Sequence, residues 1–281
     1  MQLTDQLPEK HQARRSFAAA ANGYDAAAVL QREVGKRLLE RLDLMQLQPL
    51  RVMDLGTGTG QCLGGLLGRY PKADVVALDI ALPMLAHARR RGRWLRRPRC
   101  VCADAERLPF PDNSFDLLFS NLMLQWCVDI EAAFAEFQRV LRPGGLLLFS
   151  TFGPDTLKEL RSSWEIVDGA SHVNIFLDMH DVGDALVRTR FADPVVDVER
   201  LTLTYPDVWQ LMRELKQIGA HNVTAGRARG LTGRARMQRL VAAYEQYRQA
   251  GVLPASYEIV NGHAWTASNQ CSVSVESIKR R

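Results

Sequence analysis

Apolar runs separated by helical or loop segments fill the chain between residues 51 and 150. The runs occupy residues 52–55, 75–78, 100–103, 115–119 and 146–150. This alternation predicts a parallel sheet with helices on both of its faces. Ligands of such sheets bind beyond the carboxyl ends of the strands.

The second half of the chain continues the sheet in a less regular way. Residues 195–205 and 256–265 predict two further strands, so the expected fold is α/β, with a doubly wound, mostly parallel sheet of seven strands. Two predicted helices, 206–219 and 234–250, lie between these strands. We therefore expect a helical insertion at about residues 206–250 that forms a lid over the strand ends.

Helical signals mark the segments before and after the first five strands. Apolar residues recur near the helical period over residues 11–45, which predicts one helix there. Thr156 and Glu159 have the spacing of a capping box, which predicts a helix that ends near Asp168.

These patterns divide the chain into three parts. Residues 1–48 are expected to form a helical segment that covers the ligand site. Residues 49–265 form the main domain with its insertion, and residues 266–281 form a polar tail.

The first strand ends in three alternate glycines, Gly56, Gly58 and Gly60. Glycine adopts backbone angles closed to other residues and allows a ligand to approach the main chain. Asp79 ends the second strand, where an acidic residue accepts hydrogen bonds from ribose hydroxyls. The glycine spacing differs from the G-x-G-x-x-G turn of dinucleotide-binding dehydrogenases. A glycine-rich turn without a ligand is the remaining alternative.

The run from Asp54 to Gly60 resembles the E/D-x-G-x-G-x-G motif of doubly wound S-adenosylmethionine-dependent methyltransferases. The resemblance implies S-adenosyl-L-methionine as cofactor, with Asp54 beneath its methionine end. It also implies that Asp104 meets the adenine amino group and that the segment after the fourth strand, from Asn121, faces the transferred methyl group. Alternatively, Asp104 caps a turn and the apolar residues after Asn121 belong to the core. The expected cofactor-binding residues are Gln31, Asp54, Gly56, Thr57, Gly58, Gly60, Asp79, Ile80, Asp104, Ala105 and Asn121.

Positive charge is concentrated in two stretches of this chain, whose formal net charge is +5. Residues 89–99 contain seven arginines and no acid, and a second basic stretch covers residues 227–239. Most such runs are solvated helix ends, but clustered guanidinium groups also attract carboxylates and phosphates. The aromatic interleaving of a single-strand nucleic-acid binder is absent, so we expect an acidic protein partner rather than RNA.

The composition is that of an ordinary globular protein, with 47% hydrophobic and 24% charged residues. No apolar stretch reaches the ~20 residues needed to cross a bilayer. Residues 1–10 lack the layout of a secretory signal, so we expect a cytoplasmic location. The five cysteines form no C-x-x-C pair and the histidines are scattered, so no metal site is expected.

Four segments that lie outside the cofactor motifs resemble one narrower family. The family is that of the malonyl-[acyl-carrier protein] O-methyltransferases, which open the pimeloyl branch of bacterial biotin synthesis. The resemblance implies methyl transfer from S-adenosyl-L-methionine to the free carboxylate of a malonyl thioester on acyl-carrier protein, an acidic partner. The segments that carry it are residues 17–31, 120–126, 219–234 and 257–265.

Such a reaction demands positioning rather than proton transfer. A carboxyl group has an unperturbed pKa near ~4, so the nucleophile is already an anion at neutral pH and no general base is needed. The resemblance makes Tyr24 a wall of the pocket and places Gln31 near the methionine carboxylate. The expected substrate contacts are therefore Tyr24 and one of three arginines in the insertion, with ordinary salt bridges as the alternative for each: Arg227, Arg229 and Arg234.

Two other functions are compatible with these patterns. One is a methyltransferase that acts on a small molecule or RNA. The other is a respiratory-complex assembly factor with a methyltransferase fold that hydroxylates a protein arginine, which the chain also resembles.

Overall fold

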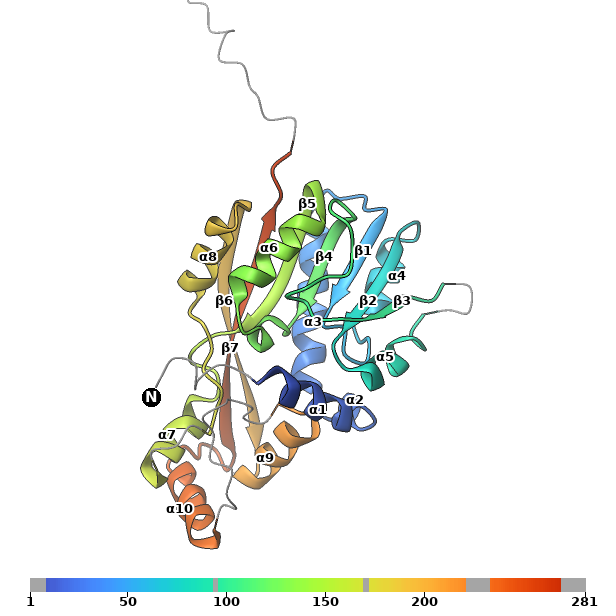
Figure 1. Cartoon of the computed structure of the whole chain (residues 1–281). Coiled ribbons are helices and arrows are strands. Elements are labelled where there is room, and N and C mark those ends of the chain that lie inside the picture. Colours follow the sequence, from blue (N-terminus) through green and yellow to red (C-terminus); the bar gives the residue numbers. More distant parts are fainter. Residues whose placement is uncertain (1–8, 93–95, 169–171, 221–232, 269–281) are drawn as a thin grey trace, which may run out of the picture.

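A seven-stranded sheet forms the centre of the computed structural model, which describes residues 9–92, 96–168, 172–220 and 233–268 (Figure 1). The strand order is β3-β2-β1-β4-β5-β7-β6. Strands β1 to β5 pair in parallel, whereas β7 is antiparallel to both β5 and β6. The predicted doubly wound, mostly parallel sheet is confirmed. The strands are β1 (Arg51–Leu55), β2 (Asp74–Asp79), β3 (Arg99–Cys102), β4 (Phe115–Asn121), β5 (Leu141–Phe152), β6 (Ala192–Tyr205) and β7 (Leu253–Trp265).

Helices cover both faces of the sheet because successive residues of each strand point to opposite sides. On β1, Val52 packs with the apolar residues of α3 and α4, whereas Met53 packs with those of α6 and α8. In the described parts of the chain, no helix is long and apolar enough to cross a membrane. The helices, with two short 3₁₀ turns, are α1 (Lys10–Ala20), α2 (Tyr24–Ala27), α3 (Val29–Arg41), η2 (Leu42–Leu44), α4 (Leu63–Arg69), α5 (Leu82–Ala88), η3 (Leu124–Trp126), α6 (Ile130–Val140), α7 (Lys158–Val167), α8 (Met179–Arg188), α9 (Val208–Gln217) and α10 (Arg234–Glu245).

A second apolar core forms where β6 and β7 extend past the neighbouring strands. Their antiparallel pairing continues to Tyr205 opposite Leu253, beyond the last residue of β5. Helices α7, α9 and α10 surround this end of the strand pair in Figure 1. Trp164, Leu211 and Tyr244 from these three helices are buried together there. The predicted insertion thus contains α9 and α10, while its residues 221–232 lie outside the described ranges.

The prediction of one continuous helix over residues 11–45 is wrong. The chain forms three helices, α1, α2 and α3, separated by turn residues that include Gly23 and by Ala28. Ala28 leaves helical geometry, with ψ at 54°, and it is completely buried against Ile218 of the insertion. Tertiary packing of small residues therefore overrides the helical periodicity of this segment.

The capping box predicted from Thr156 and Glu159 is also wrong. The Thr156 hydroxyl donates to the Glu258 carbonyl and accepts from the Glu258 amide. The Glu159 carboxylate accepts from the amide and the hydroxyl of Ser256. Both side chains fasten the start of α7 to β7, because the antiparallel strand offers them partners that the sequence spacing does not reveal.

Candidate functional site

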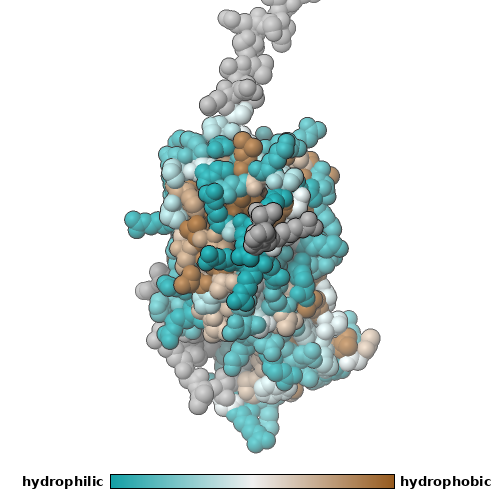
Figure 2. All heavy atoms as spheres, turned by 90° about the vertical axis from the view of Figure 1, so that its right-hand side faces the viewer, coloured by the Kyte–Doolittle hydropathy of each residue, from teal (hydrophilic) through white to brown (hydrophobic). Residues whose placement is uncertain are grey.

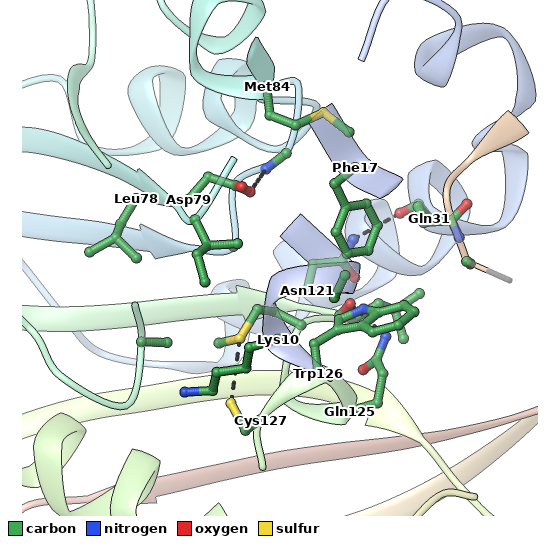
Figure 3. Close-up of a pocket in the computed structure, with 18 of the residues that line it drawn as sticks. Lys10, Phe17, Gln31, Leu78, Asp79, Met84, Asn121, Gln125, Trp126 and Cys127 are labelled. Carbon is green, nitrogen blue, oxygen red and sulfur yellow. Dashed lines mark hydrogen bonds between the residues drawn. The ribbon is translucent and has the colours of Figure 1, made fainter. Parts of the chain in front are cut away.

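A pocket opens at the carboxyl ends of β1, β2, β3 and β4 (Figure 3). Here β2 and β4 flank β1 on opposite sides, so the strand order reverses at this point. Such a switch point is where open α/β sheets bind ligands. Helices α1 to α3 and the end of α9 complete the walls. The structure brings together nine of the predicted site residues in the pocket lining: Tyr24, Gln31, Gly56, Gly58, Asp79, Ile80, Asp104, Ala105 and Asn121.

The glycine loop after β1 presents bare backbone to this pocket. Gly58 has a φ of +55°, and a Cβ added there would have the Tyr24 ring as its nearest neighbour, at 4.0 Å. Gly56 has a φ of +67°, and an added Cβ would lie 2.2 Å from the side chain of Met123. A side chain is therefore excluded at Gly56 by contact, and at Gly58 the open space allows a ligand to reach the main chain.

Asp54 and Thr57 support this loop from below without lining the pocket. Thr57 donates its hydroxyl to Asp54 over 2.6 Å, and its amide donates to the Leu78 carbonyl over 2.9 Å. Burial raises the pKa of the Asp54 carboxyl to about 7. Gly60, with a φ of +82°, ends the loop against Leu63, Arg91 and Ala88. Asp54, Thr57 and Gly60, all predicted site residues, thus stabilise the conformation of the loop.

Asp79 is a buried carboxylate at the pocket wall. One of its oxygens accepts from the Gly58 amide at 2.9 Å, and the other accepts from the Ala81 amide at 2.8 Å. Burial raises its pKa to about 6. Each carboxylate oxygen retains acceptor capacity for a ligand hydroxyl. With Ile80 and Met84 as apolar neighbours in the lining, this arrangement fits the ribose and base of S-adenosyl-L-methionine.

Asp104 lies at the end of β3, where the sequence predicts the adenine contact. Its Oδ2 accepts from the Lys10 ammonium at 2.6 Å, and Lys10 also pairs with Glu106 at 2.7 Å. The adenine contact stays a prediction. Sequence analysis missed Lys10 because nothing in the local pattern of an N-terminal helix indicates a partner that lies 94 positions further along the chain.

Side chains from α1, α3 and the end of β4 meet on the side of the pocket opposite Asp79 (Figure 3). Phe17 lies edge-on to Trp126, with ring centroids 4.9 Å apart. Asn121 donates its amide to the Gln31 carbonyl at 2.9 Å and accepts from the Ser150 hydroxyl at 2.9 Å. The fixed amide of Asn121 therefore positions α3 beside the end of β4.

Asp25 joins helix α2 to the glycine loop. Its carboxylate accepts from the Thr59 hydroxyl at 2.5 Å and from the Gln61 amide at 3.0 Å, and it pairs with Arg91. The Arg91 guanidinium also donates to the Thr59 carbonyl. Because Tyr24 precedes Asp25, this network holds the Tyr24 ring over Gly58.

Of the three arginines expected to contact the substrate, the structure describes one. Arg227 and Arg229 lie outside the described residues. Arg234 is the first residue of α10, where it is exposed and does not line the pocket. The role of these three residues stays a prediction.

Part of the arginine stretch 89–99 makes internal contacts. Arg91 pairs with Asp25, Arg96 donates to the Tyr70 carbonyl, and Arg99 pairs with Asp74. Arg89, Arg90 and Arg97 are exposed and lie next to β3, at one edge of the sheet. Figure 2 shows a largely hydrophilic surface on that side of the molecule.

Known proteins share this architecture. Residues 53–149 match the family model of a methyltransferase domain. The chain is 56% identical to the malonyl-[acyl-carrier protein] O-methyltransferase of Laribacter hongkongensis over 92% of its own length and 89% of that protein. It is 39% identical to the protein of that name from Legionella pneumophila, over 91% and 90% of the two chains. The chain belongs to this family. As a member, it is an S-adenosyl-L-methionine-dependent O-methyltransferase.

Solved structures add support for the fold. The YcgJ protein from Bacillus subtilis superposes with a TM-score of 0.58 at 17% identity, over 83% of this chain and 99% of that one. Phosphoethanolamine N-methyltransferase 2 of Haemonchus contortus, solved with S-adenosyl-L-methionine, gives 0.51 at 20% identity, over 83% and 52%. Within the described residues, no three His, Cys, Asp or Glu side chains gather in a way that could hold a metal ion.

Proposed function

We propose that this protein methylates the free carboxylate of a malonyl thioester on acyl-carrier protein and so makes the ester that starts pimeloyl synthesis for biotin. The observation that carries the proposal is the identity of 39–56% with proteins named for this activity, over nearly the whole chain. It favours this function over methylation of a small molecule or RNA, and over the role of an assembly factor.

The chemistry of the pocket is compatible with a substrate that needs no base. The described residues that line it include no histidine. The malonyl carboxylate is ionised at neutral pH and attacks as it stands. The cofactor, when bound, supplies an electrophilic methyl group on a sulfonium. The protein then has to place a carboxylate oxygen about 3–3.5 Å from that methyl group and in line with the sulfur.

Tyr24 and the insertion provide the groups that position the substrate in this proposal. Burial raises the pKa of the Tyr24 phenol, so it remains a neutral hydrogen-bond donor at the pocket wall. A neutral donor orients a carboxylate with less loss of nucleophilicity than an ion pair. One arginine among Arg227, Arg229 and Arg234 holds the distal carboxylate oxygen in the same proposal.

Substrate competition tests this function. The protein is incubated with methyl-labelled S-adenosyl-L-methionine and an equimolar mixture of malonyl-carrier protein, free malonate and total RNA. We expect label almost entirely on the carrier, as a base-labile ester. Label on RNA or on malonate instead, with the carrier unlabelled, would show that the substrate class is wrong.

A further inference from the structure

Two further hollows continue the cofactor pocket toward the surface. The inner hollow adjoins the pocket and shares Gln31, Trp126, Phe152, Ile218 and Ala220 with it. An outer hollow in turn shares five residues with the inner one: Leu157, Asn174, Phe176, Leu215 and Ala220. Together they trace a passage from the end of β4, between α7 and α9, to the surface at Lys216, which is exposed.

The inner hollow is lined mainly by apolar side chains, with the polar groups of Gln31, Thr156 and Asn174 among them. Phe152 lies between two other rings, with centroids 5.3 Å from Phe176 and 6.0 Å from Tyr257. The one charged group among its described lining residues is the carboxylate of Glu214, which accepts from the Tyr205 hydroxyl at 2.8 Å. A second anion is disfavoured beside this carboxylate, whereas a neutral chain with amide N–H donors is accommodated.

Both ends of the passage favour an anion. The inner end meets the cofactor site, where the sulfonium of bound cofactor attracts an anion. The outer end carries Lys216, and Arg213 is exposed on the same helix. A ligand that fits the passage is therefore anionic at both ends, uncharged in its middle, and extended.

We infer that the passage between α7 and α9 holds the phosphopantetheine arm of the carrier-bound thioester, with its phosphate at Lys216 and its malonyl group at the cofactor. This inference rests on the proposed function. The arm has this order of charge: a carboxylate on the malonyl group, two amides along the chain and a phosphate where it joins the carrier. Glu214 disfavours either anionic end of the arm in the middle of the passage, so the two uncharged amides lie there.

The test uses tryptophan substitutions that narrow the passage, the first of them at Leu215, which lines both hollows. Leu215→Trp places an indole in it, and Met212→Trp does the same from the outer hollow alone. Gln210→Trp is the matched control, because Gln210 is exposed on α9 and is absent from the lining of all three cavities. Affinity for S-adenosyl-L-methionine, measured by calorimetry, shows that each variant is folded.

Two readouts separate the inference from the function. The first is binding of free phosphopantetheine to the protein loaded with S-adenosylhomocysteine, followed by ligand-observed NMR. The second is kcat/KM for malonyl-carrier protein. We expect Leu215→Trp and Met212→Trp to weaken both at least tenfold and Gln210→Trp to leave both within twofold. Unchanged phosphopantetheine binding in the folded narrowed variants would overturn the inference. The function alone would be overturned by a different result: the narrowed variants lose phosphopantetheine binding, but the wild-type protein methylates no malonyl thioester.

Discussion

Among the residues of the pocket, Asp79 has the most specific predicted contact with the cofactor, since its carboxylate is expected to accept hydrogen bonds from the ribose hydroxyls. Asp79→Ala should weaken S-adenosyl-L-methionine binding by about 1.5–3 kcal/mol, the scale for hydrogen bonds to a charged group. This loss corresponds to roughly a ten- to hundredfold higher Kd by calorimetry. Asp74→Ala is the matched control, because Asp74 lies at the opposite end of β2, where it pairs with Arg51 and Arg99. Equal affinity of the Asp79→Ala and wild-type proteins would place the ribose elsewhere.

The buried position of Asp79 also makes cofactor affinity depend on pH. Its pKa in the free protein is raised to about 6, and ribose hydroxyls donate to the ionised form. Binding therefore favours loss of the proton, so affinity should rise as the pH increases through 6 and level off above pH 7. Below the pKa the change approaches about tenfold per pH unit. In Asp79→Asn this dependence should shrink, and calorimetry that gives the same pH profile for both proteins would contradict the assignment.

Sequence predicts the residues of this site where they directly follow a strand. Asp79 and Gly58 belong to short-range patterns, because a strand end fixes where its next residues point. Lys10 and Phe17 reach the pocket only through packing of α1, whose partners are distant in sequence. No local pattern encodes such contacts.

Among the elements, the short helix α2 is held in position by the contacts of the charged residue Asp25. A helix of four residues is not stable alone, so its place depends on the bonds of Asp25 to Thr59 and Arg91. Asp25→Ala should raise the Kd for S-adenosyl-L-methionine several-fold, with a cost of about 1 kcal/mol for these half-exposed contacts. Hydrogen exchange of residues 24–27 should accelerate in the same variant.

A control on the next helix isolates this effect. Glu33→Ala removes a carboxylate that pairs with Arg37, whose other partner is Glu199 of β6 rather than a residue of the glycine loop. It should change neither the Kd nor the exchange of residues 24–27. If both variants behave alike, the Asp25 network does not position α2.

Periodicity predicted that helices occupy the N-terminal segment but not where they break. Ala28 has high helix propensity, and only its burial against Ile218 reveals the break. The prediction from Thr156 and Glu159 failed for the same reason. Their spacing is that of a capping box, but their hydrogen-bond partners are on β7. Sequence therefore predicts an element well where the pattern within that strand or helix determines it. It predicts poorly the helix breaks and side-chain contacts that depend on packing between two distant elements.

For the whole molecule, the sequence predicted seven strands but not that β6 and β7 would extend past the others. That extension builds the second core and, between α7 and α9, the passage. If the passage holds the arm as inferred, the carrier docks at the outer end of α9 rather than at the arginine stretch 89–99 or the basic stretch 227–239.

Charge reversal distinguishes the two docking surfaces. Arg213→Glu with Lys216→Glu should raise the KM for malonyl-carrier protein and flatten its dependence on salt, because charges at the rim of an interface act mainly on encounter. The double variant Arg89→Glu with Arg97→Glu changes the net charge by the same amount, but at the edge of β3. It should raise the KM less than the first pair does. A larger effect of the second pair would place the carrier at the arginine stretch.

The most direct test of the central claim is to locate the transferred methyl group. After reaction with S-adenosyl-L-methionine, malonyl-carrier protein is analysed by tandem mass spectrometry of the released phosphopantetheine arm. We predict one added methyl group, on the free carboxylate of the malonyl unit, with the wild-type protein, and much less at equal time with Asp79→Ala. A methyl group on any other atom, or no methylation of the carrier by a folded protein that binds the cofactor, would contradict this account.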